Sequence, residues 1–228
     1  MDFVPFFVMK KARPIPAHWS KLPSRIRIST SIAGLYALGK REEVAQTLRI
    51  GIKRHRLTRR FFSELFLHLS LFLGYPPMLD GFETLDRIRP ARRISRHRRL
   101  QRKTLHSKGL RIFRRIYGSQ AFRVLKRLEE LHPELPHRIV EDAYGCIISR
   151  SGLTLQEREL VNVVVLALGG YQRQLFSHLR GALRAGVPPQ TVRVVLAGIG
   201  RVVGKSAPHA MSMIDVLDST PQQTEQSL

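Results

Sequence analysis

The chain has 228 residues, of which 43% are hydrophobic, so it can bury a sizeable core and is not a wholly disordered protein. Its formal charge of +22 is concentrated in one region, because residues 86–127 hold 16 Lys and Arg against one acidic residue. The one cysteine, Cys146, excludes an internal disulfide framework and a Cys-x-x-Cys redox centre, and it fits a reducing compartment.

The first 80 residues do not predict secretion or membrane insertion. At the start of the chain the apolar residues precede the lysines, which is the reverse of a secretory signal. The most apolar run, residues 61–79, contains Glu64 and His68, which favours a buried helix in water over a membrane span. We therefore expect a cytoplasmic protein that does not contact a membrane.

An internal repeat organises the chain. Residues 37–85 and residues 167–215 both begin with Ala-Leu-Gly and continue into a helix that contains Leu-Arg. In both, a short turn, a second apolar helix, a glycine and a final helix follow in the same order. The repeat predicts a diverged first unit within residues 1–85 and a more intact second unit within residues 110–218.

Residues 86–109, between the two units, predict a basic linker or a solvated helix. This segment and the arginines that follow it would attract phosphate backbones, giving salt-dependent nucleic-acid binding without sequence preference. The arginines expected to make such contacts are Arg92, Arg93, Arg96, Arg98 and Arg99. The alternative is a solvated linker with no binding role.

The second unit carries clear helix signals. Thr154 and Glu157 form a Ser/Thr-x-x-Glu capping box before an apolar run, and Gly169-Gly170 provides the stop. The Val-rich run inside this segment has strand propensity, but the capping box and the length favour a helix. We expect Cys146 to be a packed thiol and the polar tail, residues 219–228, to be disordered.

Four motifs in the second unit resemble the carboxymuconolactone decarboxylase family. They are Tyr144-Gly145, Ser149-Arg150-Ser151-Gly152-Leu153, Arg158-Glu159-Leu160 and the run from His178 to Gly186. Ser151 stands where the family has proline. The resemblance implies an all-α, alkylhydroperoxidase D-like fold with two repeats in this chain. It also implies a homo-oligomer, for which a trimer of two-repeat chains is one arrangement.

The resemblance separates two branches of the family. The alkylhydroperoxidase D-like branch carries Glu, Cys-x-x-Cys and His, and here the thiol positions are Tyr171 and Gln174 while the histidine position is His178. A redox dithiol needs two sulfur atoms within bonding reach. We therefore do not expect thiol peroxidase activity.

The decarboxylase-like branch uses no thiol, metal or cofactor, and its members act on a lactone acid. Such chemistry needs a proton donor or base and a cation for the substrate carboxylate. Glu159 and His178 are the candidate catalytic residues, and Arg158 or Arg180 could hold the anion. Further candidate substrate-binding residues are Tyr144, Tyr171 and Gln174. Alternatively, Glu159 is a first-turn acid favoured by the helix dipole, and His178 is a hydrogen-bonded core residue.

The first unit contributes a second candidate pair, Glu64 and His68, which lie four residues apart on one helix face. One hypothesis is a composite site that joins this pair to Glu159 and His178. The alternative is neutral decay of a duplicated scaffold. Glutamate and histidine can also ligate zinc or iron, but nothing in the spacing requires a metal and we expect none.

Three functions therefore stay open at this stage. The first is a cofactor-free, lyase-like acid/base enzyme acting on a small organic acid or lactone. The second is a catalytically inactive scaffold or binding protein of the same fold. The third is a nucleic-acid-associated accessory protein that acts through residues 86–127.

Overall fold

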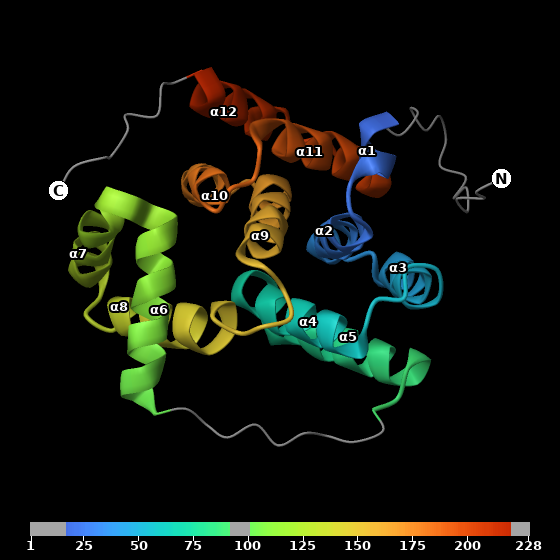
Figure 1. Cartoon of the computed structure of the whole chain (residues 1–228), viewed down its shortest axis with the longest axis horizontal. Helices are drawn as coiled ribbons and strands as arrows, with labels where there is room; N and C mark the ends of the chain where they lie inside the picture. Colours follow the sequence, from blue (N-terminus) through green and yellow to red (C-terminus); the bar gives the residue numbers. More distant parts are fainter. Residues whose placement is uncertain (1–16, 92–100, 220–228) are drawn as a thin grey trace.

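The structure is a computed structural model, and it describes residues 17–91 and 101–219. Within these ranges the chain is helical and contains no strand, which confirms the expected all-α fold (Figure 1). The candidate nucleic-acid contacts from Arg92 to Arg99 lie outside the described residues, as do residues 220–228 of the predicted tail. None of the described helices combines the length and apolar character needed to cross a bilayer.

The described N-terminal part, residues 17–91, folds into five helices, and local sequence signals mark the two ends of the fourth. Thr58 caps the fourth of them by accepting a hydrogen bond from the backbone N–H of Phe61. Gly74, with φ of 79°, then separates this helix from the next, which starts with Pro76 and Pro77 in its first turn. The helices are α1 (Ala17–Lys21), α2 (Ser24–Ala37), α3 (Arg41–Lys53), α4 (Arg59–Leu73) and α5 (Tyr75–Ile88).

The rest of the described chain is also a succession of helices, and the first of them overlaps the predicted linker. Helix α5 runs past residue 86 and ends at Ile88. Helix α6 begins at Arg102 and packs through an apolar face that includes Phe113 and Ile116. The elements are α6 (Arg102–Tyr117), η1 (Gly118–Gln120), α7 (Ala121–Leu131), α8 (Leu135–His137), the π-helix η2 (Arg138–Ile148), α9 (Leu155–Gly169), α10 (Gln172–Arg184), α11 (Pro189–Val203) and α12 (Pro208–Ser219).

Helix α9 is the centre of the fold. Every residue from Glu157 to Leu168 is buried, and α2, α4, α10 and α11 surround the helix (Figure 1). The predicted capping box is present: the Glu157 N–H donates to Thr154 Oγ1 at 3.1 Å, and the Thr154 N–H donates to Glu157 Oε2 at 2.8 Å. The Val-rich run is therefore helical, and Gly170 ends it in the left-handed region with φ of 76°.

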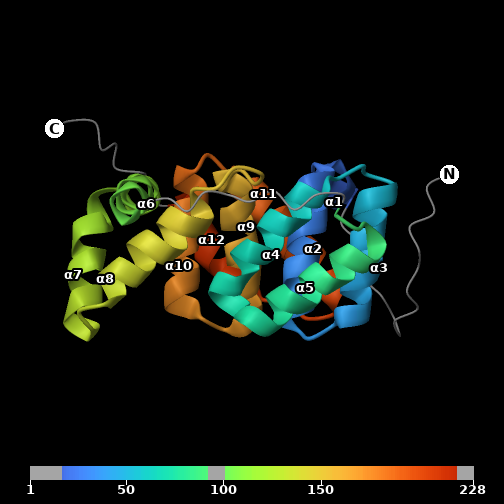
Figure 2. The same cartoon turned by 90° about the horizontal axis from the view of Figure 1, so that it is seen from below.

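One hydrophobic core joins the two predicted units. It contains residues of α2 to α5 together with residues of α9 to α12. A smaller cluster, with Phe113, Tyr144 and Ile148 at its centre, lies between α6 and η2, and Figure 2 shows α6, α7 and α8 at one end of the molecule. Cys146 is exposed on η2, so the expectation of a packed thiol was wrong.

Helices α2 to α5 have the same order and nearly the same lengths as α9 to α12. The four lengths are 14, 13, 15 and 14 residues in the first set and 15, 13, 15 and 12 in the second. Order and length alone do not establish a duplication, so the repeat stays a prediction.

Candidate active site

Glu159 and His178 face each other across neighbouring helices in the core. His178 Nδ1 lies 2.8 Å from Glu159 Oε2, which brings α10 and α9 together at this point. Glu159 is fully buried, while a tenth of the His178 side chain is exposed. Gly181 makes the approach feasible, because a Cβ at that position would lie 2.7 Å from Glu159 Oε2.

Asn162 connects this pair to the N-terminal part of the chain. Its Nδ2 donates to Glu159 Oε1 at 3.1 Å, and its Oδ1 lies 2.7 Å from His68 Nε2 on α4. An amide oxygen only accepts, so His68 carries its proton on Nε2. Asn162 was not predicted from the sequence, although a polar residue three positions after Glu159 in an apolar run was a usable signal.

The hydrogen bonds also fix the expected tautomer of His178. The buried carboxylate of Glu159 accepts, so His178 donates through Nδ1 and the neutral ring leaves Nε2 as its basic nitrogen. The Asn162 amide nitrogen, 3.3 Å from the same Nδ1, is then a close neighbour and not a hydrogen-bond donor to it.

His68 is held neutral. Burial, together with the positive charge of Arg158, lowers its pKa to about 3. Its Nδ1 is buried and has no hydrogen-bond partner among the described residues. Phe72 lies between the two histidines, with ring centroids 6.0 Å from His68 and 5.7 Å from His178.

Two tyrosines lie near the carboxylate of Glu159 from the side of α6 and η2. Burial raises the pKa of Tyr144, and the charge of Glu159 contributes in the same direction. Burial also raises the pKa of Tyr117, which is hydrogen-bonded to Tyr144. Both side chains are therefore neutral phenols at ordinary pH. Of these two residues, Tyr144 was predicted from the sequence and Tyr117 was not.

Glu64 does not contact the Glu159–His178 pair and instead neutralises two arginines. Arg150 donates to it in a bidentate manner, with Nη2 2.7 Å from Oε1 and Nε 2.9 Å from Oε2. Arg158 Nη2 lies 3.6 Å from the same carboxylate and donates to the Arg150 carbonyl at 3.0 Å. Of the predicted first-unit pair, the structure thus brings only His68 to Glu159 and His178.

Arg158 is fully buried, and its Nε and Nη1 have no hydrogen-bond partner among the described residues. Burial lowers its pKa to about 10, and the nearby Glu64 carboxylate opposes that shift. Because Arg158 leaves α9 in a different direction from Glu159, it lies beside Glu64 and not beside His178.

The remaining candidate residues lie on the outer side of α10. Tyr171 and Gln174 are exposed and Arg180 is half-buried, and the described chain shows no hydrogen bond from them to Glu159 or His178. Two cavities of about 550 and 610 Å³ lie elsewhere, over α3 to α5 and the residues just after α5. Neither cavity is lined by a predicted site residue.

Comparison with known proteins finds similarity over the part of the chain that follows α7. The model of the carboxymuconolactone decarboxylase family matches residues 133–214, which include Glu159, Asn162 and His178. This part of the chain is similar to that family. A match to Peroxisomal protein 2 of Saccharomyces cerevisiae (strain ATCC 204508 / S288c) is 33% identical over 88 residues. That match covers 38% of this chain and only 31% of the yeast protein.

Proposed function

We propose that the chain is a cofactor-free acid/base enzyme that acts on a small organic acid or lactone, with His178 and Glu159 as its catalytic pair. The observation that carries this proposal is the 2.8 Å contact between His178 Nδ1 and the buried carboxylate of Glu159. A buried carboxylate on one ring nitrogen fixes the tautomer and orientation of the ring, so that the other nitrogen can act as a base.

In this mechanism His178 Nε2 exchanges a proton with the substrate. When the substrate loses an α-proton, His178 Nε2 takes that proton and returns it to the carbanion-like centre. When a carboxylic acid loses carbon dioxide, His178 Nε2 takes the acid proton and returns it to the carbon that is left behind. Glu159 keeps the ring oriented, and Asn162 holds Glu159 through its other oxygen. His178 suits this role because, unlike Glu159, its side chain keeps some exposure.

The substrate carboxylate would be held from α10. Arg158 is already beside Glu64. Arg180 lies two residues after His178 and leaves α10 on a different side, so it could hold only the far end of a substrate that wraps around the helix. Gln174 lies one turn before His178 on the same helix, so it is placed to contact a substrate that reaches the ring. Tyr171 and Tyr144 are the further proposed contacts.

Proton exchange in heavy water tests the proposal without knowledge of the full substrate. A panel of lactone acids and β-keto acids is incubated with the protein in D2O, and proton NMR follows the exchange of the α-proton and the loss of substrate. We expect His178→Asn and Glu159→Gln each to lower the rate by about a hundredfold or more.

The matched control is His132→Asn, which changes an exposed histidine after α7 and should leave the rate unchanged. Circular dichroism and the melting temperature show whether each variant is folded. Folded variants of the pair that keep the full rate would contradict the mechanism. If no compound of the panel reacts with the wild-type chain, the scaffold or binding role is favoured instead.

A second candidate function, nucleic-acid binding, rests on the outer face of α6. Lys103, Lys108, Arg111, Arg114 and Arg115 are all exposed on this helix, which contains no acidic residue. At 100° per residue these five side chains fall within one face, so a phosphate backbone could contact them together.

Fluorescence anisotropy with a labelled duplex tests this candidate at about 50 and 200 mM salt. We expect binding that weakens with salt and that is lost when Lys108, Arg111 and Arg115 are changed to glutamine. Changing Arg41, Arg49 and Lys53 on α3 removes the same charge elsewhere and should have a much smaller effect. Equal effects of the two triple variants would argue against a dedicated surface on α6.

A further inference from the structure

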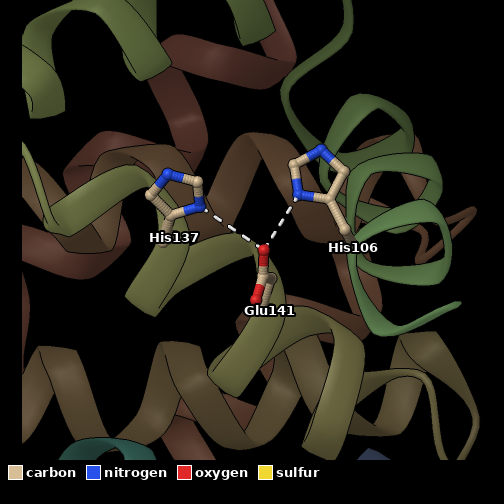
Figure 3. A group of neighbouring side chains, drawn as sticks. All are labelled: His106, His137 and Glu141. Atoms are coloured by element: carbon tan, nitrogen blue, oxygen red, sulfur yellow. Dashed lines mark hydrogen bonds and ion pairs between the residues drawn. The ribbon is translucent and has the colours of Figure 1, made fainter. Parts of the chain in front are cut away.

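Three potential metal ligands converge away from the Glu159–His178 pair. His106 comes from α6, His137 is the last residue of α8, and Glu141 lies one turn later on η2 (Figure 3). One ligand atom from each of them lies within 4.8 Å of the other two. Both imidazole rings direct Nδ1 at the same carboxylate oxygen (Figure 3).

The spacing of these atoms suits a tetrahedral ion. His106 Nδ1 lies 3.3 Å and His137 Nδ1 3.4 Å from Glu141 Oε1. Zinc binds such ligands at about 2.0–2.2 Å, so two ligands of one tetrahedron are separated by roughly 3.3–3.5 Å. Two of the three separations already match this range, and the third, between the two imidazole nitrogens, is at most 4.8 Å.

The backbone around the cluster is held closely. Helices α6 and η2 cross at two glycines, where a Cβ on Gly109 would lie 1.9 Å from the Val140 carbonyl oxygen and one on Gly145 2.3 Å from that of Leu105. His106 follows Leu105 and Glu141 follows Val140 in the sequence, so the helix crossing fixes the distance between His106 and Glu141. The π-helix carries Glu141 in the widened turn that often marks functional sites.

The three side chains of the cluster differ in how far they are buried. The Glu141 side chain is 10% exposed, whereas those of His106 and His137 are 46% and 57% exposed. The carboxylate is therefore fixed by its surroundings, while solvent and dissolved ions can reach the imidazoles. Three protein ligands leave one tetrahedral position for water or a small anion.

Arg102 competes with a cation at this place. Its Nε donates to Glu141 Oε2 at 3.0 Å, so it occupies the carboxylate oxygen that the histidines do not use. The Arg102 side chain is 83% exposed, and an ion pair of this kind contributes little and is readily displaced. We propose that His106, His137 and Glu141 form a binding site for a divalent first-row transition ion, with Zn²⁺ as the best-fitting ion.

Metal titration of the tag-free, metal-stripped full chain tests this site. Equilibrium dialysis with zinc chloride gives the stoichiometry and the Kd, and cobalt(II) absorption reports the coordination geometry. We expect one zinc per chain and the visible bands of tetrahedral cobalt. His106→Ala, His137→Ala and Glu141→Gln should each raise the Kd about tenfold or more.

Two control variants separate this site from the proposed active site. The double variant Glu159→Gln, His178→Asn should keep one zinc per chain, and His132→Ala should bind zinc as the wild type does. Arg102→Gln removes the competing cation without touching a ligand, so it should lower the Kd. This last variant tests the site even if a ligand substitution prevents folding.

The proposal is overturned by either of two results. One is a wild-type chain that binds no more zinc than the triple variant lacking all three ligands, which would leave only a hydrogen-bonded cluster. The other is loss of the zinc in the Glu159→Gln, His178→Asn variant, which would place the metal at the other site. Neither result depends on whether the chain has acid/base activity.

Discussion

At the residue scale, His68 shows how burial decides the protonation state of a group that has one good hydrogen-bond partner. Its contact with Asn162 raises the pKa, but burial and the charge of Arg158 lower it more, to about 3. A neutral His68 can act as a fixed donor to Asn162 over the whole physiological range. The histidine thus positions the amide that is hydrogen-bonded to Glu159.

This protonation state predicts a pH dependence of stability. The unfolded chain protonates His68 below its ordinary pKa of 6.5, whereas the folded chain does so only near 3. The stability is therefore fully present above pH 6.5 and is lost as the pH falls from there towards 3. At pH 5 the loss from this one group is about 2 kcal/mol relative to pH 7.

Urea unfolding at pH 7 and pH 5 measures this effect. His68→Gln can still donate to Asn162 but does not titrate, so the variant should lose about 2 kcal/mol less than the wild type between the two pH values. His132→Gln controls for an exposed histidine and should behave as the wild type does. Equal losses in wild type and His68→Gln would mean that His68 is protonated in the folded chain.

At the element scale, the contact between α6 and η2 rests on the absence of side chains. Gly109 and Gly145 place backbone against backbone, and the ligand cluster and the aromatic cluster around Phe113 both depend on this approach. A helix normally keeps its neighbour about 8–10 Å away, and only glycine allows a closer crossing. An added methyl group at either glycine should therefore destabilise the contact between α6 and η2.

Gly109→Ala is accordingly predicted to destabilise the protein by about 1–3 kcal/mol or more. Its Cβ would lie 1.9 Å from the Val140 carbonyl oxygen, which a backbone shift must relieve. Gly200→Ala on α11 is the matched control, because no atom outside its own helix comes within 3.4 Å of the added Cβ. The control should be neutral or stabilise by up to about 1 kcal/mol.

Guanidinium unfolding of the two variants gives the comparison directly. A destabilisation by Gly109→Ala that is no larger than that of Gly200→Ala would show that α6 and η2 separate at little cost. The zinc site offers a second readout, since a wider crossing should also move His106 away from Glu141.

At the scale of the whole molecule, the two predicted units share their core. Helix α9 is buried on all sides, with α2 and α4 of the first unit against it, and Gly34 on α2 packs against Leu168, Ile199 and Val203. Polar contacts cross the same boundary, from Arg25 to Glu157 and from Arg150 to Glu64. The described chain should therefore unfold as one unit.

We expect a single cooperative thermal transition for the full chain, with coincident far- and near-ultraviolet circular dichroism. A fragment of residues 101–228 would expose the side of α9 that faces α2, so it should show no cooperative transition alone. Mixing it with a fragment of residues 1–91 should restore one. A cooperative transition of the 101–228 fragment by itself would contradict the shared core.

The sequence by itself determined the helical fold and several of the positions at which helices begin and end. The capping box at Thr154, the glycine stop at Gly170 and the apolar faces are local signals, because helix ends depend on hydrogen bonds within a few residues. The family pattern likewise paired Glu159 with His178, since their spacing is carried by a motif. The predicted linker, residues 86–109, is helical from Arg102 onward, where α6 begins, and this helix buries Phe113 and Ile116.

Only the tertiary structure decided which polar groups meet across the core. His68 reaches Asn162 and Glu64 reaches Arg150 over more than 80 residues of sequence, and no periodicity encodes such contacts. The cluster of His106, His137 and Glu141 arises in the same way, from a crossing that two glycines permit. Local energetics set the helices, whereas close packing between distant segments sets the chemistry that they bring together.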